Sequence, residues 1–583
     1  MKVRLSEWFS AFVRQIIFIA GQVLLLRLNQ QTRHAHTVRQ RTLKRILLEN
    51  QNTEFGRSHH FAEILAGESL ADRYREAVPL SHYSDYETAI RRMKTGETNI
   101  LTTEPMVKLL FTSGTTGPSK LIPKIRHQRE FGVMYGMLAG ILAPGQAPKA
   151  KYTLGKGISL MSYAQPQTTS VQGIPVSTAT GAGMQRMSGM IQHLWCSPPE
   201  VFSLHDIATA RYLHALYGLR DRNVQYVTAV FAPHVLQWLM TIEQRWDELV
   251  RDIEQGTLTE NLNLSPNIRA RLIARLSPDP ARAAELRQAA AGGFREIVPH
   301  IWPHMVRIST VITGNFAVNI PAIRAYVGDM PFYGAIYAAS EGTIGISLQP
   351  NSDEYMLVPD SAYFEFIPFA EADKEQPQTV LPDALTVGEC YEIVMTNYNG
   401  LYRYRIGDIV RIAGYQHQSP KLIFVRRKSV ELDLAGEKST EVHLNTAVSH
   451  MTETWLAGSG LRLRDYTFSI NTSRNPGHYV LYIELTGNHT PSMPPNPLDE
   501  AVQELDRRLS EANAAFNFLR SELYIGIPQI KLLKPGSFDM LHEAIFARNP
   551  GGNYNQVKIP RHLKNTQLLE LLDGQVLETS TVA

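Results

Sequence analysis

The feature that most constrains this chain is a glycine- and hydroxyl-rich loop between two short apolar segments. The loop, residues 112–120, reads Thr-Ser-Gly-Thr-Thr-Gly-Pro-Ser-Lys. Residues 106–110 before it form an apolar strand pattern. Residues 121–123 after it are expected to be extended, because a residue that precedes proline avoids the helical region. The sequence therefore predicts that the loop joins two strands.

The residue types in this loop suit a polyphosphate. Its hydroxyl groups and glycines come from Ser113, Gly114, Thr115, Thr116, Gly117 and Ser119. Glycine lets backbone amides turn inward and form a concave nest for an anion, and Lys120 adds a positive charge. A P-loop requires Ser or Thr directly after its lysine and then a helix, whereas Leu121 follows Lys120, so this is a different phosphate loop. The alternative is a polar surface hairpin rich in turn-forming residues.

Composition indicates a globular protein of several domains. A chain of 583 residues corresponds to about two to four domains. Hydrophobic residues make up 44% and charged residues 19%, as in a protein with a full core. The net charge of +3 is too small to argue for a nucleic-acid partner. Cys196 and Cys390 are far apart and indicate neither a disulfide framework nor a zinc site, which fits a reducing cytoplasm.

The N-terminal segment allows two interpretations. Residues 15–26 are mostly apolar, between Arg14 and Arg27. That run is shorter than the roughly 20 residues a bilayer requires. A signal peptide is disfavoured because Arg27 interrupts the run and no small-residue cleavage site follows. We expect a buried first helix and no transmembrane segment, with peripheral membrane contact of residues 1–30 as the alternative.

The order of the predicted elements indicates an α/β enzyme. Helical patterns cover residues 37–50, 83–93, 126–142, 224–250 and 280–291. Strand patterns at 306–313 and 332–338 run into polar segments, and ligands of α/β folds lie beyond such strand ends. Composition changes near Arg426-Arg427-Lys428. We therefore predict a large domain of mixed β-sheets and helices over residues 1–428 and a small α+β domain over residues 429–583.

A hairpin is predicted just before this boundary. Asn399-Gly400 lies between strand patterns at 391–396 and 401–406, a strong hairpin signal. Alternation would place Tyr402 and Tyr404 on one face and the neighbouring arginines on the other. Gly407-Asp408 is expected to turn the chain into residues 409–412. In the small domain we expect a helix from about residue 440, strands at 466–471, 479–486 and 529–533, and a helix at 498–520.

Several segments together resemble known enzymes. The loop at 112–120 resembles the phosphate loop of adenylate-forming enzymes, the superfamily of acyl-coenzyme A synthetases and luciferases. The chain is also similar to the acyl-acid amido synthetases, best known as plant auxin-responsive enzymes that join hormones to amino acids, in segments 301–303, 311–314, 337–341, 400–408 and 555–561. The likeness runs from about residue 70 to 570 and is specific as a combination. The phosphate loop is one residue shorter than in the plant enzymes and reads more like the acyl-coenzyme A synthetase version.

The resemblance implies a reaction and its substrates. The large domain would bind ATP and a carboxylic acid, form an acyl-adenylate and release pyrophosphate, with Mg²⁺ as the metal. The small domain would then rotate, and the amine of an amino acid would attack to give an amide. The first alternative is transfer to coenzyme A. The second is a catalytically idle scaffold protein, which the presence of Ser113, Glu341 and Asp408 argues against. No protein partner is implied. Met134, Tyr135, Met161 and Phe231 suggest an apolar or aromatic acid, although core packing would explain them equally well.

The resemblance also assigns roles to residues that bind the nucleotide. Ser113, Gly114, Thr115, Thr116 and Gly117 would hold the β- and γ-phosphates. Thr313, Gly314, Tyr337 and Ala338 would surround the adenine, with Tyr337 stacked on it. Ser340 would touch a phosphate and Glu341 would ligate Mg²⁺, a cation that prefers carboxylate and phosphate oxygens. Without the resemblance, Tyr337 reads as the edge of a core and Glu341 as a carboxylate at a helix N-terminus.

The remaining roles concern the sugar and the moving domain. Asp408 would accept hydrogen bonds from both ribose hydroxyls, and Arg427 would contact the ribose or α-phosphate at the hinge. Lys558 would approach the α-phosphate during adenylation and withdraw afterwards, while Lys120 and Lys438 are further catalytic candidates. Taken alone, Gly407-Asp408 is a plain turn, Arg427 belongs to a solvated basic run, and Lys558 is an exposed lysine.

Overall fold

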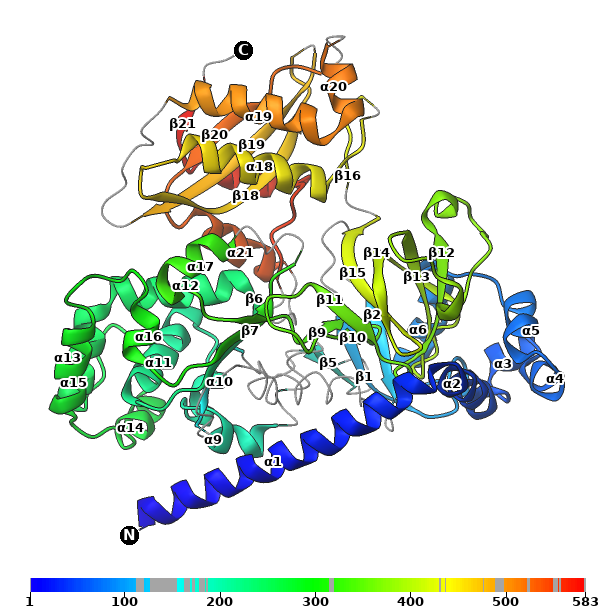
Figure 1. Ribbon diagram of the computed structural model, residues 1–583, viewed down its shortest axis with the longest axis horizontal. Helices are drawn as coiled ribbons and strands as arrows, with labels where there is room; N and C mark the ends of the chain where they lie inside the picture. Colours follow the sequence, from blue (N-terminus) through cyan, green and yellow to red (C-terminus); the bar gives the residue numbers. More distant parts are fainter. Residues whose placement is uncertain are drawn as a thin grey trace.

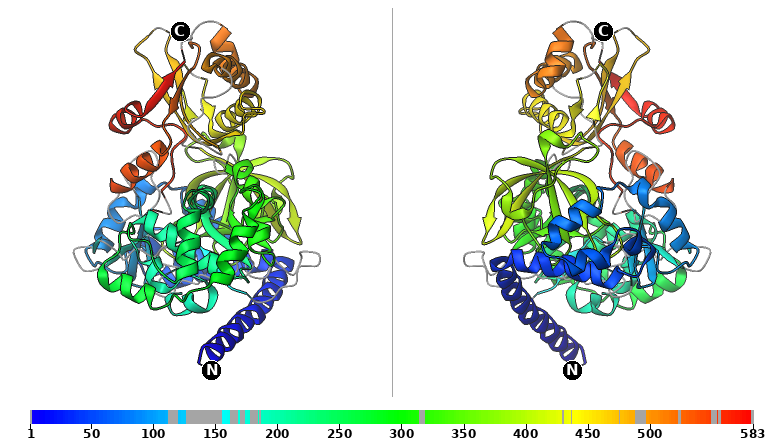
Figure 2. Two further views of the ribbon diagram at one scale, coloured as in Figure 1. Left: turned by 90° about the vertical axis from the view of Figure 1, so that its left-hand side faces the viewer. Right: turned by 90° about the vertical axis from the view of Figure 1, so that its right-hand side faces the viewer.

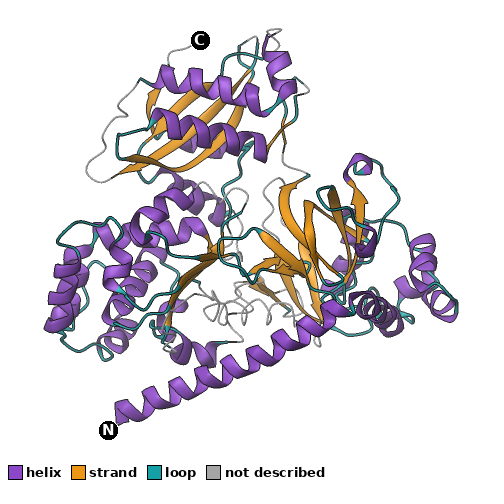
Figure 3. Ribbon diagram, viewed as in Figure 1, coloured by secondary structure: helices purple, strands orange, loops and turns teal. Residues whose placement is uncertain are grey.

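Figure 1 shows a computed structural model of the chain, in which a small domain lies above a large one. The structure describes residues 2–111, 120–125, 155–161, 168–169, 174–177, 184, 187–313, 319–428, 431–435, 437–474, 476–487, 497–521, 525–548, 554 and 557–580. The large domain combines helices with several β-sheets, and the small domain packs helices on a single larger sheet (Figure 3). The predicted fold class is confirmed.

A parallel sheet organises one half of the large domain. Its order is β3 (Gly157–Ser159), β6 (Tyr226–Phe231), β7 (Arg307–Val311) and β8 (Phe332–Tyr333). The helices around it are α9 (Ile191–Leu194), α10 (Pro199–Phe202), α11 (Ile207–Arg220), α12 (Ala232–Gln244), α13 (Trp246–Gln255), α14 (Pro266–Ile273), α15 (Pro280–Ala289), α16 (Ile297–Ile301) and α17 (Ile320–Val327). Apolar side chains from the strands and helices form one continuous core.

An antiparallel sheet forms the other half. Its order is β12 (Tyr363–Pro368), β13 (Cys390–Thr396), β14 (Tyr404–Gln416), β15 (Ser419–Arg427), β11 (Glu354–Leu357), β10 (Thr343–Ile346) and β9 (Ile336–Ala338). Short 3₁₀ turns η4 (Phe369–Glu371) and η5 (Pro382–Ala384) interrupt the β12–β13 connection. The long β14–β15 pair ends at Arg427, just before the small domain.

The strands that bracket the predicted phosphate loop form a third sheet. Its order is β2 (Leu121–Ile125), β1 (Met106–Phe111), β5 (Pro175–Ser177) and β4 (Thr168–Thr169). β1 and β2 are antiparallel, with Phe111 opposite Leu121, so the prediction that the loop joins two strands is confirmed. The loop itself, residues 112–119, lies outside the described residues, as does the helix predicted at 126–142.

Helices precede these sheets in the sequence. They are α1 (Lys2–Arg33), α2 (Ala35–Asn50), α3 (Glu54–Ser58), α4 (Phe61–Ala66), α5 (Leu70–Ala77) and α6 (Tyr83–Lys94), and the 3₁₀ turn η2 (Ser188–Met190) follows later. The expectation of a buried first helix is wrong, because large apolar side chains of α1 such as Trp8 (78% exposed) and Leu26 (70%) face solvent. By length and composition, Trp8–Arg33 would also be long and apolar enough to cross a membrane, a test that signal sequences and core helices pass as well.

The small domain carries helices on both faces of its sheet. The sheet order is β18 (Leu461–Asn471), β19 (His478–Gly487), β20 (Gln529–Leu533) and β21 (Val576–Thr579). One face packs against α18 (Glu441–Trp455), α19 (Leu498–Ala512) and α20 (Ala514–Ser521), and the other against α21 (Ser537–Ala547) and α22 (Thr566–Asp573). A short ribbon of β16 (Glu431–Leu432) and β17 (Ser439–Thr440) leads in from the large domain. The predicted boundary at 428/429 stays a prediction.

Three sequence predictions need correction. The helix expected over residues 224–250 begins with strand β6, whose alternating burial matches a half-buried strand before α12 starts at Ala232. The strand expected at 332–338 is divided at Gly334 between β8 and β9, which belong to different sheets. The helix expected at 498–520 is broken at Asn513, whose side chain caps α20 and bonds to the β17 region.

Gly407-Asp408 is a bulge inside β14 and not a turn. On one side Arg405 pairs with Val394, and on the other Ile409 pairs with Glu392, so the two extra residues stand out from the β13 ladder. Gly407 has φ of +82°, a left-handed conformation that a side chain would make costly. Asp408, within the bulge, lies opposite Arg427 in the β14–β15 ladder.

Candidate functional site

Asp408 is the centre of a buried polar cluster. Its carboxylate is 3% exposed and accepts a hydrogen bond from Arg427 Nε at 2.7 Å and another from the Tyr337 hydroxyl at 2.8 Å. Asp408 and Arg427 are opposite each other in the β14–β15 ladder, which fixes this pair. The Asp408 carboxylate raises the pKa of Arg427, and burial together with Asp408 raises the pKa of Tyr337 far above its ordinary value. At neutral pH the Tyr337 phenol therefore stays protonated and the arginine charged.

Glu341 lies at the tip of the hairpin between β9 and β10. Reciprocal backbone hydrogen bonds between Ala339 and Gly342 close this hairpin around Ser340 and Glu341. Glu341 is therefore not at a helix N-terminus, which removes that alternative. Its carboxylate is 6% exposed, hydrogen-bonds the Tyr404 hydroxyl and adds to the field that acts on Arg427. A carboxylate so placed has an oxygen with which to ligate a cation.

Thr313 and Tyr337 meet through Tyr355. The side chains of Thr313 and Tyr355 are hydrogen-bonded, and the rings of Tyr355 and Tyr337 are 5.5 Å apart between centroids. Phe424 packs edge-on against Tyr337, with 5.9 Å between the ring centroids. These aromatic contacts fix the phenol that points at Asp408. Ala338, next to Tyr337 on β9, is exposed.

Lys558 reaches this cluster from the small domain. Its ammonium lies 5.0 Å from the centre of the Phe231 ring, at the end of β6 in the large domain. Burial lowers the pKa of Lys558 to about 8; the Arg427 cation acts in the same direction, and the carboxylates of Asp408 and Glu441 oppose it. The charges of Lys558, Arg427 and Asp408 therefore act on one another across the domain interface.

The segment that carries Lys558 is held firmly on the small domain. The Thr467 hydroxyl donates to the Pro560 carbonyl at 2.6 Å, and Phe468 N donates to the Arg561 carbonyl at 2.9 Å. The buried Arg561 guanidinium also pairs with Asp465 at 2.5 Å. These bonds fix the position of Lys558 relative to the small domain.

The other two predicted lysines, Lys120 and Lys438, are exposed. Lys120, at the start of β2, is exposed and lies 5.5 Å from the centre of the Tyr83 ring. Lys438 is exposed on the β16–β17 ribbon with φ of +48°. The structure thus brings Thr313, Tyr337, Glu341, Asp408, Arg427 and Lys558 together, with Ala338 and Ser340 beside them. Ser113, Gly114, Thr115, Thr116, Gly117 and Gly314 lie outside the described residues.

Sequence reasoning missed the side chains that support this cluster. Tyr404 holds Glu341, and Tyr355 and Phe424 pack around Tyr337. Only the strand register would have revealed Tyr355 and Phe424. In the β11–β15 pair Tyr355 lies opposite Leu422, which is two residues from Phe424.

Arg403 and Arg405, in the same segment as Asp408, are structural. Arg403 pairs with buried Glu365 at 3.1 Å and Arg405 with buried Glu392 at 2.5 Å, and both guanidinium groups also donate to backbone carbonyls. These pairs anchor the start of β14 and so position the bulge that carries Asp408.

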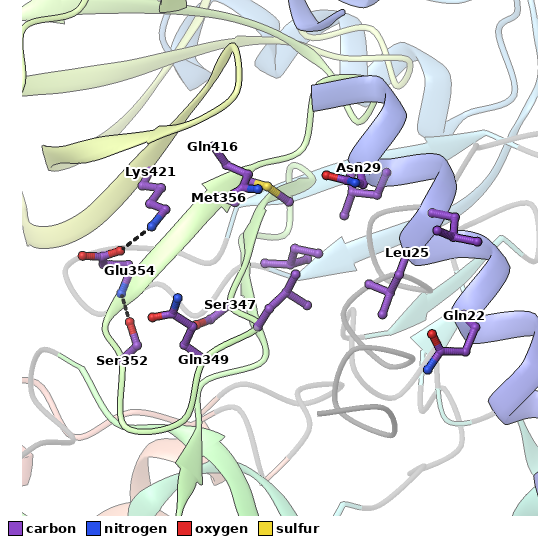
Figure 4. Close-up of a pocket in the computed structure, with 14 residues that line it drawn as sticks. Gln22, Leu25, Asn29, Ser347, Gln349, Ser352, Glu354, Met356, Gln416 and Lys421 are labelled. Atoms are coloured by element: carbon purple, nitrogen blue, oxygen red, sulfur yellow. Dashed lines mark hydrogen bonds and ion pairs between the residues drawn. The ribbon is translucent and has the colours of Figure 1, made fainter. Parts of the chain in front are cut away.

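A separate cavity lies under α1. It has a volume of about 390 Å³ and is formed between α1 and the β10–β11 hairpin, with Gln22, Leu25 and Asn29 on one side and Ser347, Glu354 and Met356 on the other (Figure 4). It shares no lining residue with the Asp408 cluster. Within the ranges given above, no group of three or more His, Cys, Asp and Glu side chains could hold a metal ion by itself.

Comparison with known proteins identifies the class of ligase to which this two-domain chain belongs. Residues 24–332 match the GH3 family N-terminal domain, 355–427 its central domain and 442–567 its C-terminal domain. The chain belongs to the GH3 family of acyl acid amido synthetases, the family that the sequence motifs predicted.

Relatives and solved structures match along nearly the whole chain. A probable indole-3-acetic acid-amido synthetase of Arabidopsis thaliana is 31% identical over 94% of this chain and 93% of that protein. A jasmonoyl–L-amino acid synthetase of Oryza sativa subsp. japonica is 31% identical over 94% of this chain and 96% of that protein. The structure of the GH3.15 acyl acid amido synthetase superposes with a TM-score of 0.82 at 28% identity, covering 96% of this chain and 97% of that one.

Proposed function

We propose that this chain activates an apolar carboxylic acid with ATP and Mg²⁺ and transfers the acyl group to the amine of an amino acid. The observation that carries the proposal is the Tyr337–Asp408–Arg427 cluster at the domain interface with Lys558 beside it. In the first step a carboxylate oxygen of the acid attacks the α-phosphorus of ATP and pyrophosphate leaves. In the second step the amine attacks the acyl carbon, AMP leaves, and the amine loses a proton. The amine is itself the nucleophile, so no protein nucleophile is required.

Asp408 is proposed to hold the ribose. Its two oxygens retain free lone pairs beside the bonds from Tyr337 and Arg427, and a buried carboxylate binds a pair of hydroxyls strongly. Arg427 supplies a fixed cation next to the sugar and the α-phosphate. The Tyr337 ring, held by Tyr355 and Phe424, offers a rigid edge for adenine beside Thr313 and Ala338. Gly314 and residues 113–117 complete the proposed nucleotide site.

Mg²⁺ fits the donor set around Glu341. This cation is usually held by one or two carboxylates together with substrate phosphates, and Glu341 offers one buried carboxylate beside Ser340. When bound, Mg²⁺ neutralises charge on the phosphates and orients them. Tyr404 keeps the Glu341 carboxylate directed at that position by its hydrogen bond.

Lys558 is proposed to stabilise the transition state of adenylation. Negative charge builds up on phosphoryl and carboxylate oxygens as the acid attacks, and an ammonium group fixed nearby stabilises it. Lys558 comes from the small domain, so rotation of that domain would remove it and free the space for the amine. Lys120 would act on the outer phosphates, and Lys438 is retained as a candidate for the rotated arrangement.

The substrates are inferred from the relatives. One relative described above is named for indole-3-acetic acid, and the other for a jasmonoyl group and an L-amino acid; both acids are apolar carboxylic acids. We propose an acid of this class for this chain. The alternative reaction is formation of a thioester with coenzyme A. We also propose that the activity is located in the cytoplasm.

The test is a two-stage assay. Pyrophosphate release is measured across a panel of carboxylic acids with ATP and Mg²⁺, and products with mixed amino acids or with coenzyme A are then identified by mass spectrometry. Asp408→Asn should raise the KM for ATP by about tenfold to a hundredfold, since hydrogen bonds to a charged group contribute about 1.5–3 kcal/mol each. The matched control is Asp329→Asn, at an exposed carboxylate of the large domain. Absence of acid-dependent pyrophosphate release, or an equal effect of both variants, would overturn the proposal.

A further inference from the structure

Helix α1 presents an unpartnered apolar surface. Six large side chains recur on one face over Trp8–Leu26 and are 50% to 78% exposed: Trp8, Phe12, Ile16, Ile19, Val23 and Leu26. We call this set the α1 stripe. At 1.5 Å per residue it is about 27 Å long, and a contiguous exposed apolar surface of this kind marks an interaction site. Packing against the large domain therefore does not explain the apolar side chains of this exposed face of α1.

The opposite face of α1 is bound to the large domain. Ser10 Oγ and the Arg14 guanidinium contact His193 at 2.9 Å and 2.7 Å, and Leu28 packs in a small core with Val358. Gln31 donates to Asp360 at 2.6 Å near the other end. The helix is thus docked lengthwise, with the α1 stripe turned outward.

The segment that forms α1 and α2 is strongly positive. Residues 1–50 contain nine Lys and Arg against Glu7 and Glu49, a formal charge of +7. Since the whole chain carries +3, the remaining residues carry −4. On α2, the next helix, Arg41, Lys44 and Arg45 are exposed. An anionic surface would therefore attract this end and repel the rest of the protein.

We propose that α1 and α2 dock the protein on the surface of an anionic lipid bilayer, with the α1 stripe buried at the level of the headgroups. An apolar face containing Trp and Phe next to basic residues is typical of helices that lie in the plane of the interface. A lipid surface accounts for both the stripe and the charge, whereas a second copy of α1 would bring like charge against it. A spanning helix would need to give up the contacts with His193 and Asp360.

The arrangement of the domains is compatible with this surface. α1 runs along the side of the large domain that faces away from the small domain, and its N-terminal part projects beyond the body (Figures 1 and 2). The small domain can therefore rotate while α1 is docked. The GH3 N-terminal domain match starts at residue 24, so most of the α1 stripe precedes it, and the docking function is separate from the proposed chemistry.

The test is flotation of the full chain with vesicles. Binding is expected to mixed phosphatidylcholine–phosphatidylglycerol vesicles, to fall with added salt, and to be weak on pure phosphatidylcholine. A triple variant of the stripe, Phe12→Ser with Ile19→Ser and Val23→Ser, should lower the partition coefficient at least about tenfold. A charge variant, Arg41→Gln with Lys44→Gln, should lower it about tenfold on the anionic vesicles only.

A matched control uses exposed apolar residues elsewhere. Phe518→Ser with Val387→Ser and Leu577→Ser changes side chains that are 61%, 55% and 48% exposed and should leave vesicle binding unchanged. All variants should release pyrophosphate at the normal rate without lipid, which shows that they are folded. The proposal is overturned if the control variant loses vesicle binding equally. It is also overturned by binding that resists salt and alkaline carbonate, which would indicate a spanning helix. A dimer that depends on the α1 stripe and does not bind vesicles would likewise overturn it and would indicate a second copy of the chain as the partner.

Discussion

The charge state of Lys558 offers the sharpest test of the proposed chemistry. Burial lowers its pKa from 10.5 to about 8, so the free enzyme loses this positive charge in a pH range where most lysines keep theirs. If the protonated amine stabilises adenylation, kcat/KM for ATP in the adenylation half-reaction should decline above pH 8. This parameter reports ionisation in the free enzyme.

The magnitude follows from the pKa. One pH unit above a pKa of about 8, about a tenth of the Lys558 side chains remain protonated, so kcat/KM should be about tenfold lower at pH 9 than on the plateau. Lys558→Arg keeps its charge over this range and should remove the alkaline decline. Lys558→Met has no charge at any pH and should cost about a hundredfold to a thousandfold on the plateau, the usual effect of losing one transition-state donor.

The assay is ATP–pyrophosphate exchange with a single acid and no amino acid, which keeps the titration of the acceptor amine out of the measurement. Transfer from preformed acyl-adenylate to the amino acid is measured separately and should change little in Lys558→Met. Lys564→Met, at an exposed lysine of the same domain, is the matched control. An alkaline decline that persists in Lys558→Arg, or an equal loss in both half-reactions for Lys558→Met, would refute the reasoning.

Three further outcomes are expected. Glu341→Gln should raise the Mg²⁺ concentration for half-maximal pyrophosphate release at least about tenfold, because a ligating charge is lost; unchanged Mg²⁺ dependence would exclude the role. Arg403→Met should lower the unfolding free energy of the large domain by about 3–5 kcal/mol in urea titrations, because buried Glu365 is left unpaired, and a loss below 1 kcal/mol would contradict that account. Burial holds the pKa values of His234 and His542, whose rings meet across the domain interface, at about 3 and about 4, below the ordinary 6.5. Below pH 6.5 the separated domains bind more protons than the joined ones, so the rate of adenylation should fall by up to about tenfold per histidine for each pH unit of acidification. His542→Asn should make this fall smaller. If the rate of the variant falls as steeply as that of the wild type at low pH, the two histidines are not the cause.

Local patterns predicted the fold where their physical cause is local. The hairpin around residues 112–120 follows from a proline-restricted strand and turn-forming residues, and β1 and β2 pair as expected. Strand β6 was missed because its apolar residues run straight into those of α12, and only its parallel neighbours β3 and β7 show that the segment is extended. The prediction of a buried first helix was wrong for a related reason. Apolar periodicity shows that one face of a helix avoids water, but it does not show what covers that face.

The candidate site shows the same division. The resemblance assigns nucleotide-binding roles to Asp408, Arg427 and Tyr337, and the structure places their side chains within hydrogen-bonding distance. The bulge that contains Asp408 could not be predicted from Gly407-Asp408 alone, because a bulge is defined by the partner strand β13. Likewise the lowered pKa of Lys558 depends on its packing against the other domain, which no local pattern contains.

The low pKa of Lys558 also bears on how the domains would alternate. Direct bonds between the domains include Gln237 to Asp539 at 2.9 Å and Asn319 to the Arg464 carbonyl at 2.7 Å, and water can replace polar contacts of this kind. The free-energy cost of burying the Lys558 ammonium beside Arg427 opposes these bonds between the domains. The phosphates of ATP would offset that cost and favour the arrangement seen here. Departure of pyrophosphate would restore part of the cost, because only the α-phosphate remains. On the proposed function, the same buried charge that assists adenylation therefore drives the small domain away once adenylation is complete.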